Sequence, residues 1–170
     1  MEESVSRSKP QVAPLSSDAP HEVKFYKRHR DDDKVQTIPG LDALLGFPVK
    51  VRARLLATLS AVAKAPPKRF AGGGQWEAMH GDMTGYFEAR VTSSTPNGKW
   101  HYRLFCVLDY TAQGKAIPLL VVLDGAAKRY QTTLSNARYA EVRDLGDEYR
   151  ERNPRSFATA EDVSAAFGSD

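Results

Sequence analysis

Cysteine is nearly absent from this sequence, and long apolar runs are missing altogether. The single cysteine, Cys106, cannot form a disulfide within the chain, and its strand-like surroundings predict a small buried side chain in a cytoplasmic, reducing setting. No apolar stretch approaches the ~20 residues that a membrane-spanning helix requires. The first ten residues start with acids and contain no apolar segment, so we expect no signal peptide and no membrane association.

Several motifs with well-defined chemistry are also missing. The four histidines lack the spacing of a zinc site, and there is no nucleophile elbow, dinucleotide fingerprint or helix-turn-helix. The glycines at 72–74 are not followed by Gly-Lys-Ser/Thr, so they predict a flexible connector and not a phosphate loop. The run Asp31-Asp32-Asp33 lacks the spaced oxygens of a calcium loop and favours a solvated loop. The sequence therefore predicts neither a metal nor a cofactor.

Charge is distributed unevenly along the 170 residues, which suffice for one domain with its own core. The net charge is +3, but residues 21–70 carry 11 Lys and Arg against 5 Asp and Glu, whereas residues 140–170 carry 4 against 8. Basic surface attracts phosphate backbones. The cations in the basic part of the chain are therefore candidate RNA-binding residues: Lys50, Arg52, Arg54, Lys68 and Arg69.

The order of predicted elements begins with a tail. Residues 1–20 hold five Ser and three Pro, which predicts disorder, and the alternation around Val23 and Phe25 predicts a first strand near 21–26. Two helices follow, at 39–45 and from Pro48 to the double proline at 66–67. The second helix carries an apolar stripe that must face a sheet or another helix: Val51, Leu55, Leu59 and Val62.

Turn signals at 96–98 and 114 divide the next segment into an antiparallel meander of three strands, over 84–94, 99–110 and 117–124. Ser135 then predicts the start of a helix that ends before Asn153-Pro154. The resulting order is typical of an α+β domain spanning 21–155. Residues 156–170 form a C-terminal extension, in which Thr159 indicates the start of a short helix.

Cations recur at alternate positions of the predicted strands. Side chains alternate between the two faces of a strand, so Phe87, Ala89 and Val91 share one face and Glu88 shares the other with Arg90. The same alternation separates Leu104 and its apolar neighbours from the basic residues of the second strand. If the strands are neighbours, one face forms a core and the other gathers Arg90, His101, Arg103, Lys128 and Arg129.

Such a cluster of fixed cations with a titratable group suits a phosphodiester. The alternative is structural: Arg90 and Arg103 pair with Glu88 and Asp109 on an exposed sheet face.

Three segments resemble the RelE/HigB-like toxins of bacterial type II toxin–antitoxin modules, including the phage-derived branch. Phe87-Glu88-Ala89-Arg90 is similar to the aromatic-Glu-Leu-Arg strand of that branch. His101-Tyr102-Arg103-Leu104-Phe105 is similar to its aromatic-Arg-hydrophobic strand. The segment from Gly125 to Thr133 is similar to its basic turn into the last helix.

This resemblance implies a RelE-like microbial ribonuclease fold, an antiparallel sheet with N-terminal helices and a C-terminal helix. It also implies an endoribonuclease that cleaves mRNA on the ribosome through attack of a ribose 2′-hydroxyl on the adjacent phosphate. Arg90, Arg103, Lys128 and Arg129 would hold the phosphate, whereas proton transfer would fall to Glu88, His101 or Tyr130.

The implied partners are mRNA, the ribosome and a cognate antitoxin, expected to be a small helix-turn-helix protein. Two alternatives stay open. The chain is then either a non-catalytic member of the same superfamily, such as a gyrase-directed toxin, or a domesticated nucleic-acid-binding domain.

Overall fold

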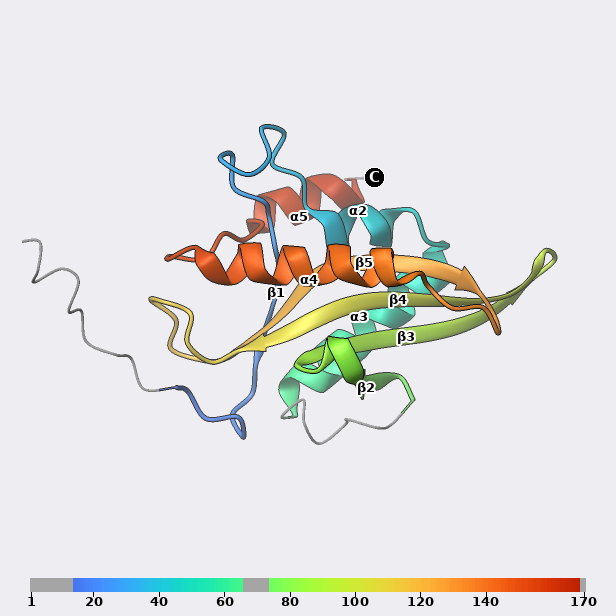
Figure 1. Cartoon of the computed structure of the whole chain (residues 1–170), viewed down its shortest axis with the longest axis horizontal. Helices are drawn as coiled ribbons and strands as arrows, with labels where there is room; N and C mark the ends of the chain where they lie inside the picture. The colour runs from blue at the N-terminus through green and yellow to red at the C-terminus, as the bar shows by residue number, and fades with distance from the viewer. Residues whose placement is uncertain (1–13, 66–73, 169–170) are drawn as a thin grey trace, which may run out of the picture.

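A computed structural model describes residues 14–65 and 74–168 and confirms the α+β class (Figure 1). Its elements follow the predicted order, with one additional short strand. They are β1 (Glu22–Phe25), α2 (Pro39–Leu45), α3 (Val49–Lys64), β2 (Trp76–Ala78), the 3-10 turn η2 (Gly81–Met83), β3 (Tyr86–Thr95), β4 (Gly98–Asp109), β5 (Leu119–Arg129), α4 (Asn136–Glu151) and α5 (Ala160–Phe167). No helix in the described part of the chain is long and apolar enough to cross a membrane.

The five strands form one mixed sheet in the order β1-β5-β4-β3-β2. The predicted antiparallel meander is confirmed for β3, β4 and β5, and β2 joins β3 antiparallel. The expectation of an antiparallel sheet is wrong for β1, which pairs parallel with β5. Between these two strands the chain forms α2, α3 and the strands β2, β3 and β4.

Strand β5 is longer than its sequence predicts. Its pairing with β4 continues through Ala126 and Ala127 to Arg129, where the sequence predicts a turn. One irregularity interrupts the pairing: Phe105 faces Asp124 and Cys106 faces Val122, so Leu123 is an extra residue, a β-bulge.

The larger core lies between the sheet and α2, α3 and α5. The stripe predicted on α3 is buried there against Leu104, Cys106 and their neighbours, with Leu55 fully covered. Burial raises the pKa of the Cys106 thiol well above its ordinary value, which fits the predicted packing role. The alternation of apolar side chains in β3 and β4 is thus confirmed.

Helix α4 packs on the opposite face, in front of the sheet in Figure 1, with α3 behind. Val142 and Tyr149 are buried against side chains of β4 and β5, including Phe105 and Val107. Gly146 lets the helix approach the sheet, because a Cβ there would lie 2.2 Å from the Tyr86 hydroxyl.

The two ends of the described chain are tied to the sheet. Leu15 N–H donates to the Tyr110 carbonyl at 2.9 Å, whereas residues 1–13 of the predicted tail lie outside the described residues. In the C-terminal extension, Ala158 N–H donates to the Phe25 carbonyl at 2.8 Å and α5 packs Phe167 onto the larger core. The extension therefore contributes to the core of the domain.

Candidate functional site

The register of β3, β4 and β5 brings the predicted basic residues together. Arg90 lies opposite Arg103, and His101 lies opposite Lys128, so these four side chains project from one face of three adjacent strands. Glu88 projects from the same face, two residues before Arg90 on β3. We call these five residues the sheet-face cluster: Glu88, Arg90, His101, Arg103 and Lys128.

Arg103 and Glu88 form the buried centre of the cluster. The Arg103 Nη1 atom lies 3.0 Å from Glu88 Oε1, and both residues are less than one tenth exposed. The pair is incompletely satisfied, because Arg103 Nε is buried without a hydrogen-bond partner among the described residues. Buried polar atoms without partners are rare in folded proteins and concentrate at functional sites. The ion pair of Arg103 with Glu88, which the structural interpretation of these arginines predicts, is thus present. It leaves one buried donor of Arg103 without a hydrogen bond among the described residues.

A cavity of about 540 Å³ opens beside this pair, and we call it the Glu88 pocket. Tyr139 of α4 closes one side, with its hydroxyl 3.4 Å from Arg103 Nη1. Glu77 of β2 closes the other side, 3.1 Å from Arg90 Nη2. The sequence motifs missed both residues, because neither belongs to a strand of the predicted meander. Figure 1 shows α4 in front of the sheet and β2 next to β3, at the edge of the sheet.

His101 is poised to accept a proton. Its Nδ1 lies 2.6 Å from the Thr92 hydroxyl on the adjacent strand, a contact that fixes the ring. Partial burial, followed by the positive charges of Arg103 and Lys128, lowers the pKa of His101 below its usual value. The imidazole is therefore neutral near neutral pH and available as a base.

Lys128 is a further titratable group of the cluster. Burial and then the neighbouring Arg103 lower the pKa of its ammonium group. Its Nζ also donates to the Thr132 carbonyl, which holds the side chain in place beside the cluster.

Arg129 does not join the cluster. Because adjacent residues of a strand point to opposite faces, Arg129 shares the face of Trp100 on the α3 side, with its guanidinium 5.4 Å from the Trp100 ring centre. The expectation that Lys128 and Arg129 act together came from assigning them to a turn, whereas both lie in β5. Tyr130 comes next and returns to the cluster side, 5.0 Å from the His101 ring.

The candidate RNA-binding residues have different environments. Arg54 is exposed and lines a second cavity beside Arg90, and Lys50 is exposed on α3. Arg52 instead has a structural role, because it donates to the Leu45 and Phe47 carbonyls at 3.2 Å. The remaining two candidates, Lys68 and Arg69, lie outside the described residues.

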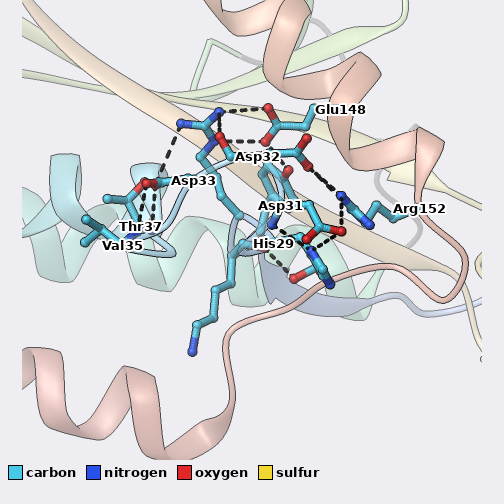
Figure 2. Close-up of polar contacts among 12 residues, drawn as sticks. His29, Asp31, Asp32, Asp33, Val35, Thr37, Glu148 and Arg152 are labelled. Atoms are coloured by element: carbon cyan, nitrogen blue, oxygen red, sulfur yellow. Dashed lines mark hydrogen bonds and ion pairs between the residues drawn. The ribbon is translucent and has the colours of Figure 1, made fainter.

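A second group of charges joins the loop after β1 to the end of α4 (Figure 2). We call it the loop cluster, and it comprises Arg28, Asp31, Asp32, Asp33, Glu148 and Arg152. Arg28 donates twice to Glu148, each time at 2.9 Å, and Arg152 lies 3.2 Å from Asp32. Asp33 accepts from the Val35 and Thr37 amides, which fits the predicted loop. No group of three or more acids, histidines or cysteines in residues 14–65 and 74–168 could hold a metal ion.

No family model matches the chain, and no curated protein or solved structure is significantly similar to it. Function must therefore be argued from the two charge clusters themselves, and the sheet-face cluster is the one in which cations outnumber acids.

Proposed function

We propose that the chain is an endoribonuclease toxin that cleaves mRNA, with the sheet-face cluster as its active site. The observation that carries the proposal is the register of three strands. It gathers two arginines, a lysine with a lowered pKa and a histidine with a lowered pKa on one half of a sheet face. Phosphodiester transfer requires a base, an acid and fixed positive charge beside the phosphate, and the side chains of the cluster can supply all three.

The proposed reaction needs no group beyond these side chains. The ribose 2′-oxygen attacks the adjacent phosphorus while its proton moves to the neutral His101 ring. Arg90 and Arg103 stabilise the negative charge that develops on the phosphate oxygens. The bond to the 5′-oxygen then breaks, and that oxygen takes a proton from Lys128. The products are a 2′,3′-cyclic phosphate and a 5′-hydroxyl end.

Glu88 and Glu77 act as positioning residues in this scheme. Glu88 lies 3.0 Å from Arg103 and 3.9 Å from Arg90, and Glu77 contacts Arg90 from the other side. The carboxylates thus hold both guanidinium groups toward the open half of the face. A positioned donor contributes more than a free one, because it need not reorganise in the transition state.

The proposed substrate implies a cytoplasmic protein whose partners are mRNA, the ribosome and a neutralising antitoxin. An uncovered cationic face is costly in a cell full of RNA, so we propose that a small partner with acidic or amphipathic segments blocks it. Co-expression with the product of the adjacent reading frame, followed by pull-down, tests this part.

Induced expression followed by mapping of RNA 5′ ends tests the activity. We expect growth arrest with new 5′-hydroxyl ends in mRNA at preferred sequences. The double variant Arg90→Gln, His101→Gln should accumulate to the same level without new ends. Intact mRNA in growth-arrested cells would overturn the proposal, and DNA damage with intact mRNA would favour a gyrase-directed toxin instead.

A further inference from the structure

A second cavity adjoins the sheet-face cluster at the edge of β3. It measures about 470 Å³ and is lined by Arg54, Gln75, Arg90, Thr92, His101 and Tyr130. We call it the Tyr130 pocket. Its volume falls in the range of small-ligand sites. Arg90 and His101 belong both to this pocket and to the proposed active site, so a ligand filling the pocket would lie directly beside the scissile phosphate.

Tyr130 is an unusual residue for this surface. It is 42% exposed, although large aromatic side chains are mostly covered in folded proteins. The ring is nevertheless held in place, because Lys99 Nζ lies 4.1 Å from its centre and the Tyr130 amide donates to the Lys99 carbonyl at 2.8 Å. A fixed and accessible aromatic ring between cations is the surface on which an unpaired base stacks.

Positive charge reaches the pocket from two elements. Arg90 extends from β3, and Arg54 extends from the exposed side of α3. Arg54 forms no ion pair with any residue in the described ranges, so its charge is free to meet an external anion. The two guanidinium groups can therefore hold the phosphates on either side of one stacked base.

We infer that the Tyr130 pocket binds one unpaired nucleotide of the RNA next to the cleavage point, with its base on the Tyr130 ring and its outer phosphate at Arg54. This inference rests on the proposed function and names its substrate class as single-stranded RNA. Bases of a duplex stack on each other and cannot cover a protein ring. Tyr130 thus serves in base binding, and proton transfer is left to His101 and Lys128.

Binding to a short fluorescent RNA with 2′-O-methyl riboses tests the pocket, because this probe cannot be cleaved. Fluorescence anisotropy should show that Tyr130→Leu weakens binding about tenfold, whereas Tyr130→Phe keeps the affinity of the wild type. Arg54→Gln should also weaken binding several-fold. Arg30→Gln is the matched control, because Arg30 is an exposed arginine of the loop after β1 and lies outside the pocket, and it should change affinity by less than twofold. A hairpin with the same composition should bind more weakly than the single strand.

The outcomes separate this inference from the proposed function. Equal affinity of Tyr130→Leu and wild type, equal loss in Arg54→Gln and Arg30→Gln, or no binding of the single strand would overturn the nucleotide pocket. Cleavage of cellular mRNA is measured in a separate experiment, so the pocket can fail while the proposed function stands. Loss of cleavage preference at one base position in Tyr130→Leu cells would support the pocket independently.

Discussion

The loop cluster and the sheet-face cluster are two groups of charged side chains in the same domain, and they differ in how their cations are paired with acids. In the loop cluster acids outnumber cations, and the guanidinium of Arg28 is matched by two contacts to Glu148. In the sheet-face cluster cations outnumber acids, and Arg103 Nε has no hydrogen-bond partner among the described residues. The cations of the first group are thus paired within the protein, whereas the second group has an excess of positive charge.

The pKa shifts of Arg28 and Lys128 agree with this difference between the two clusters. The hydrogen bonds to Glu148 raise the pKa of Arg28, so the folded protein stabilises that charge. Burial and the neighbouring Arg103 lower the pKa of Lys128, so the folded protein destabilises its charge. A bound phosphate would reverse the second effect. The comparison therefore favours a structural role for the loop cluster and supports the ligand-binding role that we propose for the sheet-face cluster.

Removing Arg103 should have the largest effect, because it acts on both stability and activity. Arg103→Ala removes the nearer of the two arginines beside the buried Glu88 carboxylate, and we expect a loss of about 3–5 kcal/mol in the free energy of unfolding. Cleavage should fall at least ~10²-fold when measured well below the melting temperature. Urea unfolding and primer extension on a defined mRNA measure the two effects.

The double variant Glu88→Leu, Arg103→Met separates these effects. Since no buried charge is left alone, most of the stability should return while cleavage stays low. Leu104→Ala is the matched core variant on the same strand. It should cost about 2–5 kcal/mol because Leu104 is fully buried, yet it should spare the cleavage rate of the molecules that remain folded. Recovery of cleavage in the double variant would show that Arg103 is structural only.

Lys128 and Arg129 provide a comparison of adjacent cations on opposite faces. Lys128→Gln should lower the cleavage rate ~10²-fold because the leaving oxygen loses its proton donor. Arg129→Gln should change the rate by less than about twofold, since its side chain stacks on Trp100 away from the site. Single-turnover cleavage of one oligonucleotide measures both. Equal losses would mean that net charge, and not position, sets the activity.

Arg90 and Arg28 should show opposite patterns. Arg90→Ala should lower the cleavage rate about tenfold or more and change stability by less than about 1 kcal/mol, because its ion pair with Glu77 is partly exposed. Arg28→Ala should cost about 1–2 kcal/mol of stability, because it breaks two charged hydrogen bonds at the loop, and leave cleavage unchanged. A loss of cleavage in Arg28→Ala would assign the loop cluster to the site.

The smallest expected effect is on pH dependence. Because His101 has a lowered pKa and acts as a base, the cleavage rate should stay high at pH 6.5 and fall only as the pH drops below the lowered value. Lys99 is one of the charges that lower the pKa, so Lys99→Gln should move the acid limb to higher pH. NMR titration of the His101 ring checks the direction. Lys115→Gln is the control, because Lys115 lies near Phe157 instead.

Much of the fold followed from the sequence wherever a repeating pattern was long enough. The α3 stripe and the alternation in β3 and β4 each extend over several repeats, and both predicted the buried face correctly. Strand β2 has only three residues, too few for a pattern, so its Glu77 was missed. The continuation of β5 was missed because Gly125-Ala126-Ala127 has weak strand propensity and is stabilised by pairing with β4.

The composition of the site was less predictable than its location. The alternation placed Arg90, His101 and Arg103 on one face because each lies in a regular strand. The contacts of Tyr139 and Glu77 depend on how α4 and β2 dock, which no local pattern encodes. The same holds for the loop cluster, where Arg28 and Glu148 are 120 residues apart in sequence.

The bulge at Leu123 shifts the alternation of side chains along β5 by one residue. Before it, even-numbered side chains such as Leu120 and Val122 point toward α3, and after it the even-numbered Lys128 points toward the opposite face. If Leu123 paired in regular alternation, without the bulge, every residue downstream would point to the other face. Arg129 would then lie on the side of the sheet-face cluster and Lys128 on the side of Trp100. The cation that joins the sheet-face cluster is thus selected by one extra residue, five positions away.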